Sequence, residues 1–94
     1  MSRNRSRIRN RERKIRKRLL TDLRDRIGFM VDSLRLESRR EPMGFSGVVV
    51  RATWGTTTQT VLELNYASLD HSYSETMTAV DWSSVVQRCG ELRQ

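Results

Sequence analysis

The sequence predicts a small α+β domain with a long N-terminal helix, an antiparallel sheet of two or three strands and a short C-terminal helix. Three observations support this fold class. Apolar residues recur at helical spacing before residue 41, alternate at strand spacing between residues 48 and 66, and return to helical spacing after residue 81. Side chains repeat every 3.6 residues in a helix and every two in a strand, so these periods predict the element types. A chain of 94 residues has room for one such domain.

The N-terminal helix is predicted to begin at Asn10, a favourable N-cap residue, and to end no later than residue 41. Pro42 sets that limit because the residue before a proline is biased away from helical backbone. The apolar stripe of this helix consists of Leu20, Leu23, Ile27, Met30, Val31 and Leu34. Residues 1–9 have almost no apolar side chains to offset their charge, so we expect them to be disordered when no partner is bound.

The sheet is predicted from residues 48–54 and 58–66, which are rich in β-branched and aromatic side chains. A short hairpin, Gly55-Thr56-Thr57, connects the two strands. The side chains expected on the buried face are those of Val48, Val50, Ala52, Trp54, Thr60, Leu62, Leu64 and Tyr66. Residues 67–72 are interpreted as a loop, and residues 73–80 as a weaker third strand.

The C-terminal helix is predicted to follow Asp81, another favourable N-cap residue. Gly90 is well placed to end it. Its apolar positions, at helical spacing, are Trp82, Val85, Val86 and Cys89. We expect both tryptophans to anchor the packing between sheet and helices, and Cys89 to be a small core residue.

Positive charge is concentrated in an N-terminal arm, residues 1–18, which we distinguish from a body formed by residues 19–94. The arm contains ten basic residues and one acidic residue, a net charge of +9, whereas the body has a net charge of −2. Clustered guanidinium groups repel one another unless an anionic partner neutralises them. This asymmetry predicts that the chain binds a polyanion.

Arginine suits the recognition of a nucleic-acid backbone, because its planar fork donates paired hydrogen bonds to phosphate and stays charged. In a helix, the basic residues of the arm would surround the axis, which favours insertion among phosphates. A membrane-surface helix would instead keep its basic and apolar faces apart. The candidate nucleic-acid-binding residues are Arg3, Arg5, Arg7, Arg9, Arg11, Arg13, Lys14, Arg16, Lys17 and Arg18.

The kind of nucleic acid is indicated by what the basic segment lacks. No aromatic residue occurs in residues 1–28, so the stacking platforms of single-strand binders are missing there. This favours structured RNA or a duplex over unstructured strands, and of the two nucleic acids we favour RNA over DNA as the partner. Neutralising about six to ten phosphates would lower the affinity by roughly 10³–10⁵ between 50 and 200 mM salt.

The order helix, strands, helix in residues 20–92 is similar to that of double-stranded-RNA-binding domains. That resemblance implies phosphate contacts from a lysine-rich start of the last helix. Here the corresponding residues, 81–84, are acidic and neutral, so the arm and the first helix would have to bind the duplex. In composition alone, the arm also resembles the arginine-rich RNA-binding helices of phage and viral proteins.

Other classes of function find little support in the sequence, and we expect no enzyme, metal or cofactor. A single cysteine and a single histidine, His71, are too few for an intrachain disulfide or a zinc site of the usual type. Asp70, His71 and Ser72 are adjacent in sequence, but a catalytic triad is a spatial arrangement. No apolar run approaches the roughly 20 residues of a transmembrane helix. Without a signal peptide, the expected location is intracellular, in the nucleus or the cytoplasm.

We therefore predict an RNA-binding protein that contacts the phosphate backbone of structured or double-stranded RNA, in the manner of small viral accessory proteins that sequester RNA. We expect a homodimer, because a sheet of so few strands leaves edges that a second copy can cover. The alternative is a protein–protein interaction module acting on a host or partner protein. Its basic arm would then serve as a nuclear localisation signal.

Overall fold

The computed structural model describes residues 3–40 and 46–94 of the chain, with the backbone alone for residues 3–9. Its elements, in chain order, are α1 (Arg3–Ile27), η1 (Gly28–Met30), β1 (Ser33–Arg40), β2 (Ser46–Trp54), β3 (Thr57–Asn65), α2 (Tyr66–His71), α3 (Tyr73–Thr78) and α4 (Trp82–Leu92). The predicted α+β class is confirmed: a long helix precedes a three-stranded antiparallel sheet, and a short helix follows it.

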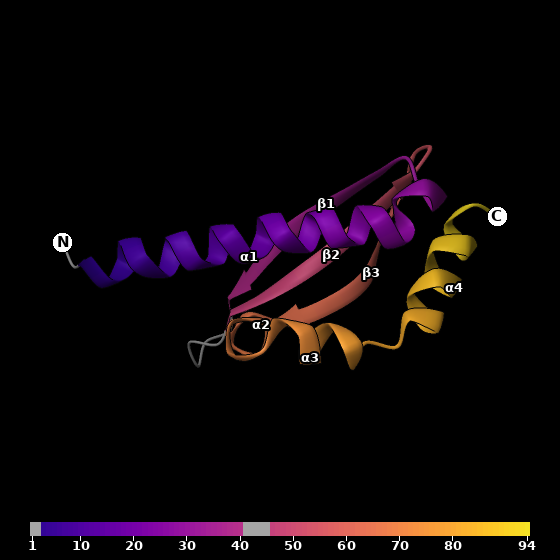
Figure 1. The fold of residues 1–94 in the computed structure, drawn as a ribbon. Helices are drawn as coiled ribbons and strands as arrows, with labels where there is room; N and C mark the ends of the chain where they lie inside the picture. The colour runs from indigo at the N-terminus through magenta and orange to yellow at the C-terminus, as the bar shows by residue number, and fades with distance from the viewer. Residues whose placement is uncertain (1–2, 41–45) are drawn as a thin grey trace.

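The sheet has the order β1-β2-β3, with both neighbouring pairs antiparallel. Figure 1 shows α1 running along the sheet, with α2 and α3 beside it and α4 at the end of the molecule far from the N-terminus. The hairpin between β2 and β3 turns at Gly55, which has a φ of 61°. Glycine adopts this left-handed backbone without steric cost, so the predicted hairpin is confirmed at the residue that permits it.

The first helix ends before residue 41, as predicted, but the prediction that its apolar stripe continues to Leu34 is wrong. The helix ends at Ile27, a single 3₁₀ turn follows, and the third strand of the sheet is β1 rather than residues 73–80. In β1, Leu34 and Leu36 alternate with Arg35 and Glu37, which is the period of a half-buried strand. Leu34 satisfied both the helical and the strand period, so its fit to the helical stripe was accidental. Pro42 lies outside the described residues.

The N-terminal limit of the helix also differs from the prediction. The helical backbone begins at Arg3, seven residues before Asn10. Residues 67–72 and 73–80, interpreted as loop and strand, contain the short helices α2 and α3. The Asn65 side chain caps α2 by accepting a hydrogen bond from the Ser68 amide, while Thr76 and Thr78 bond back to carbonyls four residues earlier. These local bonds satisfy backbone polar groups. In a strand, the same groups would need hydrogen bonds to a neighbouring strand.

The core lies between the helices and one face of the sheet. Leu19, Leu23 and Ile27 are spaced four apart on α1 and fully buried, as are Val48, Val50 and Ala52 of β2. Burying an aliphatic side chain of this size contributes about 1.5–3 kcal/mol. Trp54 and Trp82 are half-buried against this cluster, as predicted. The remaining buried apolar residues are Val31, Leu36, Val61, Leu62, Tyr66, Leu69, Met77, Val85, Cys89 and Leu92.

A β-bulge changes the expected face of one residue. The pairing of β2 with β3 shifts between Val50 and Arg51, so that Val61 is an extra residue and is buried beside Leu62. Thr60, expected on the buried face, instead lies opposite Arg51 and accepts a hydrogen bond of 3.3 Å from its guanidinium. An extra residue in one strand reverses the alternation beyond it.

The C-terminal helix agrees with its sequence signals except at its end and at Val86, which was expected on the apolar face but is 42% exposed. The Asp81 carboxylate accepts hydrogen bonds from the amide and hydroxyl of Ser84, which confirms the predicted N-cap. These bonds hold the pKa of Asp81 below its usual range. Cys89 is buried in the core, as predicted, whereas the helix continues past Gly90 to Leu92.

Candidate nucleic-acid interface

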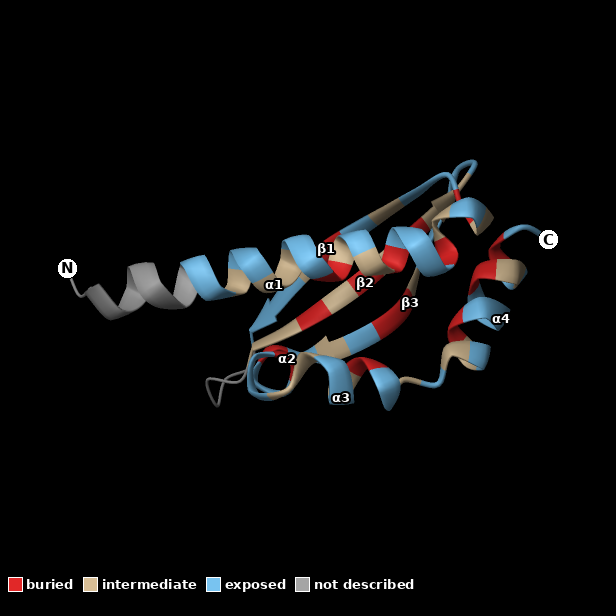
Figure 2. Cartoon of the chain, viewed as in Figure 1, coloured by how far each residue is buried: buried red, intermediate tan, exposed pale blue. Residues whose placement is uncertain are grey.

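The arm and the body share one continuous helix, because residue 18 lies in the middle of α1. At 1.5 Å per residue, the 25 residues of α1 extend over about 37 Å. Figure 1 shows its N-terminal part projecting beyond the sheet, and Figure 2 shows that, among the residues coloured by burial, the buried ones of α1 lie where the helix crosses the strands. The arm is therefore a helical extension whose direction is set by the packing of the body.

Arg16 is turned towards the sheet and is held there. Its Nη1 donates to Ser38 Oγ at 2.6 Å and its Nη2 to the Leu36 carbonyl at 2.8 Å, so it joins α1 to the edge strand β1. Arg11 connects the arm to the body, with its guanidinium 3.9 Å from the Asp70 carboxylate. Both members of that pair are exposed, and an exposed ion pair contributes little to stability.

Arg18 is oriented by an aromatic ring. Its guanidinium carbon lies 3.8 Å from the centre of the Tyr73 ring on α3. The Tyr73 hydroxyl in turn donates a short hydrogen bond to the carboxylate of Asp22, one helical turn beyond Arg18. Partial burial, followed by this hydrogen bond and the charge of Asp22, raises the pKa of the Tyr73 phenol well above its usual value. The phenol therefore remains a donor at neutral pH and fixes the ring under Arg18.

Three other candidate residues face solvent. Arg13, Lys14 and Lys17 are exposed on the side of α1 away from its buried residues, and no hydrogen bond or ion pair within the described residues involves their side chains. They belong to a set of helical positions that we call the outer stripe. Its members, offset by 3, 4, 7, 11 and 14 residues from the first, are Asn10, Arg13, Lys14, Lys17, Thr21 and Arg24.

The first four candidates, Arg3, Arg5, Arg7 and Arg9, lie on the projecting part of α1. Their backbone is helical, and their side chains are outside the described part of the structure. The first turn of α1 contains no acidic residue. Because the N-terminus of a helix has a partial positive charge, the basic side chains there are destabilising until an anion approaches.

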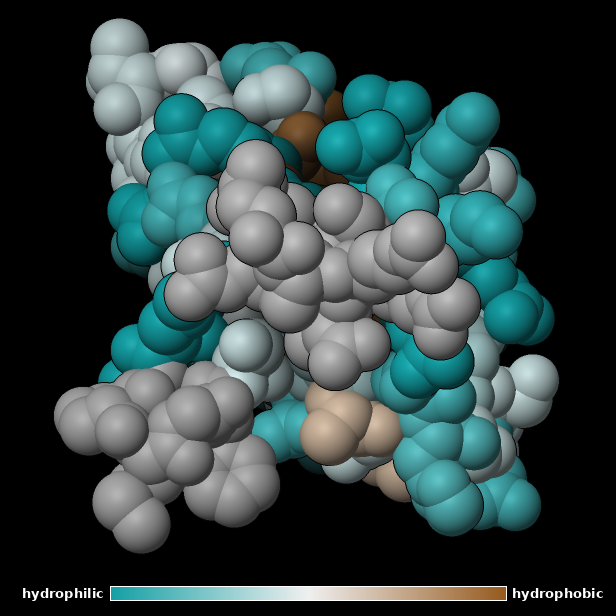
Figure 3. Space-filling view, turned by 90° about the vertical axis from the view of Figure 1, so that its left-hand side faces the viewer, coloured by the Kyte–Doolittle hydropathy of each residue, from teal (hydrophilic) through white to brown (hydrophobic). Residues whose placement is uncertain are grey.

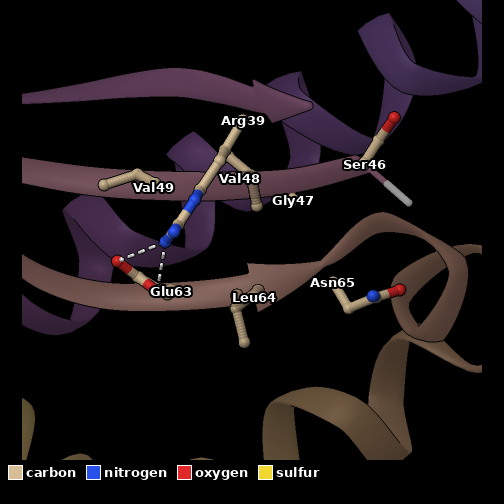
Figure 4. Close-up of a pocket in the computed structure, with 8 residues that line it drawn as sticks. All are labelled: Arg39, Ser46, Gly47, Val48, Val49, Glu63, Leu64 and Asn65. Atoms are coloured by element: carbon tan, nitrogen blue, oxygen red, sulfur yellow. Dashed lines mark hydrogen bonds and ion pairs between the residues drawn. The ribbon is translucent and has the colours of Figure 1, made fainter. Parts of the chain in front are cut away.

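Several basic residues on the uncovered face of the sheet are paired with carboxylates. Figure 3, which faces the end from which the arm projects, shows a mainly hydrophilic surface around it. On the uncovered face of the sheet, Arg35 lies 2.5 Å and Arg51 3.8 Å from the Glu37 carboxylate. In a shallow hollow of about 280 Å³, Arg39 reaches across the sheet to Glu63 at 3.3 Å (Figure 4). This face therefore lacks the excess positive charge of the outer stripe.

Other kinds of site receive no support from the described residues. No group of three or more His, Cys, Asp or Glu side chains among them could hold a metal ion. His71 is exposed, as expected for a lone histidine, although it ends a helix rather than lying in a loop. Burial raises the pKa of the Cys89 thiol, which makes it a poor nucleophile. Within the same residues, none of the helices has the length and apolar character needed to cross a membrane.

Comparison with known protein families, curated proteins and solved structures finds no match for this chain. Sequence reasoning missed Tyr73 and Asp22, which orient one candidate arginine, because they are 51 residues apart. The only signal that could have indicated this pair is the place of Asp22 on α1, next to the apolar stripe and one turn from Arg18.

Proposed function

We propose that this protein binds structured or double-stranded RNA through the phosphate backbone, using the helical N-terminal arm. The observation that carries the proposal is the solvent-facing cluster of Arg13, Lys14 and Lys17, continuous with the arginine-rich end of the same helix. These cations have no internal partner among the described residues, so phosphates would neutralise them without breaking contacts of the fold. Binding to anions would also relieve the repulsion at the helix N-terminus.

Single-stranded RNA is a less suitable ligand, because three of the aromatic rings near the helices are already covered by arginines. Guanidinium groups lie over the rings of Tyr73, Trp82 and Trp54, with distances of 3.8, 4.4 and 4.6 Å to the ring centres. A base would have to displace an arginine to stack there. This supports recognition of a backbone rather than of unstacked bases.

The mechanism is stoichiometric masking without catalysis. The arm would cover phosphates of the bound RNA, while the body fixes the direction of the helix. This is the action by which a small viral accessory protein could sequester RNA from other proteins. Arg16 would contribute through its contacts to β1, which hold the helix in place, and Arg18 through a guanidinium whose free edge remains available to phosphate.

A homodimer would place two arms on one RNA and raise the affinity through their effective concentration. Both edge strands already have a carbonyl bound by an arginine, Leu36 by Arg16 and Val61 by Arg88 at 3.0 Å. These bonds oppose pairing of sheet edges. The uncovered face of the sheet, with Val49 half-buried at its centre, is therefore the surface we propose for the second copy.

The proposal is tested by replacing Lys14 and Lys17 together with glutamine. We expect the slope of log affinity against log salt for an RNA duplex to fall by roughly 2, because each phosphate contact contributes about 0.9. The matched control replaces Arg26 and Arg93, which lie over the rings of Trp82 and Trp54, and so removes the same charge elsewhere. Anisotropy titrations with duplex RNA, single-stranded RNA and duplex DNA measure both variants. Equal losses in the two variants would show non-specific attraction and contradict the proposal.

The second candidate function, a protein-interaction module with a localisation signal, is favoured by one observation. Phe29, in the 3₁₀ turn after α1, is 80% exposed, and exposed aromatic residues are common anchors of protein interfaces. In that case the replacement of Lys14 and Lys17 would change the cellular location of the protein and leave its weak affinity for RNA duplexes unaltered.

A further inference from the structure

We propose that the nucleic-acid site continues beyond the arm, along the outer stripe of α1, as far as Arg24. This inference rests on the proposed function and adds a contact residue that belongs to the body. Arg24 is exposed and has no hydrogen bond or ion pair within the described part of the chain. It lies seven residues, or two helical turns, beyond Lys17, and therefore projects on the same side of the helix.

The outer stripe forms a straight row of basic side chains. Eleven residues separate Arg13 from Arg24, which corresponds to about 16 Å along the helix axis. None of the six positions of the stripe is acidic. Asp22 is turned away from it and bonds to Tyr73, and Asp25 lies beside it on the neighbouring face. A phosphate row that follows Arg13 and Lys17 would reach Arg24 without meeting an acidic residue of the stripe.

The rotation of the helix about its axis is fixed by the body. Leu19, Leu23 and Ile27 are fully buried on the opposite side, so α1 cannot turn without exposing them. Contacts with α3 and α4 also hold one side of α1. There the guanidinium carbon of Arg26 lies 4.4 Å from the centre of the Trp82 ring. Because these contacts hold Arg24 facing outward, its binding requires little ordering of the backbone, which reduces the entropic cost of association. A rigid straight row of cations matches the regular phosphates of a duplex better than a flexible strand.

Arg24 and Arg26 form a matched pair for the test. They have the same charge and are two residues apart on one helix, so they project to nearly opposite sides. Arg24 belongs to the outer stripe, whereas the guanidinium of Arg26 is engaged by Trp82. If only net charge matters, replacing either arginine should weaken RNA binding equally. If the stripe contacts phosphate, only the replacement of Arg24 should weaken it.

The experiment compares Arg24→Gln, Arg26→Gln and Lys17→Gln in the full chain, with a labelled RNA duplex two helical turns long and a salt series. We expect Arg24→Gln to lower the salt slope by about 0.9, as Lys17→Gln does, and Arg26→Gln to leave the slope unchanged. Thermal unfolding of each variant checks the fold. Equal effects of Arg24→Gln and Arg26→Gln would overturn the inference, as would an unchanged slope for Arg24→Gln.

The outcomes also separate this inference from the proposed function. If Lys17→Gln lowers the slope and Arg24→Gln does not, the site ends within the arm, and the function stands while the extension is wrong. If neither variant changes binding to the duplex, the proposed function itself fails. Charge reversal, Arg24→Glu, provides a second test of contact between Arg24 and phosphate. It should weaken binding more than Arg24→Gln, and an equal effect would contradict direct contact with phosphate.

Discussion

At the scale of single residues, the basic side chains of the arm differ in what they do, although the sequence presents them as one group. Arg16 and Arg18 contact β1 and α3, whereas the side chains of Lys14 and Lys17 make no hydrogen bond or ion pair within the described residues. Position on the helix decides the difference, because the strands cover only one side of α1. Binding and structural roles can therefore be separated by single substitutions.

Arg16 provides the first such separation. Replacing Arg16 with alanine should lower the free energy of unfolding by about 1–2 kcal/mol, since two hydrogen bonds are lost and the Leu36 carbonyl is left without its donor. Replacing Lys17 with alanine should change it by less than about 0.5 kcal/mol. Urea denaturation measures both. A variant of Arg16 as stable as the original chain would mean that the two bonds contribute nothing net.

Tyr73 makes stability depend on alkaline pH. The folded state raises the pKa of the phenol above its usual value of about 10, so the folded chain holds this proton more tightly than the unfolded chain does. The resulting contribution is complete below pH 10 and is lost as the pH rises above it. Comparison of the original chain with Tyr73→Phe by urea denaturation between neutral and alkaline pH should show a steeper loss in the original chain. Parallel losses would rule out the Tyr73–Asp22 bond as the cause.

At the scale of elements, the sequence predicted those whose signals are local. The hairpin at Gly55 and the cap at Asp81 follow from one or two residues each, and both are confirmed. The end of the first helix was not predictable in this way, since Leu34 fits a helical stripe as well as a strand. The choice depends on β2, which provides the backbone partners for β1. The spacing of apolar residues in this segment fits both a helix and a strand, and pairing with β2 makes it a strand.

The candidate site, like the elements, could be predicted from the sequence only in part. Its basic character could be predicted from the sequence, because charge is a property of the residues alone. The contacts of Arg18 with Tyr73, and of Arg16 with Leu36, join residues that are 55 and 20 positions apart in the sequence. No periodic pattern in the sequence predicts them. The boundary at residue 18 likewise falls inside α1, because a helix is limited by backbone geometry and not by a change in net charge.

At the scale of the whole molecule, the arm and the body are mechanically one unit, and this governs how the arm can be removed. A deletion of residues 2–18 would also remove Ile15, which packs against the core, and the contacts of Arg16. Loss of RNA binding in such a chain could then reflect a damaged body. The projecting part before Asn10 is the section that can be removed with the smallest effect on the described contacts.

We therefore expect a chain lacking residues 2–9 to keep its melting temperature within about 2 °C, because the start of α1 projects beyond the sheet (Figure 1). It loses four arginines, so the salt slope for duplex RNA should fall by up to about 4. Differential scanning calorimetry and anisotropy titrations measure the two effects. A large fall in melting temperature would indicate that the projecting helix packs on the body.

The positions of the two tryptophans have a practical consequence for optical measurements. Trp54 precedes the hairpin turn and Trp82 begins α4, at the end of the molecule remote from the arm (Figure 1). Both indoles are half-buried in the packing of the body. Their fluorescence emission should therefore report on unfolding while remaining insensitive to ligands on the projecting helix. An unlabelled chain thus has a built-in reporter of its folded fraction, readable in the same cuvette as a titration with dye-labelled RNA.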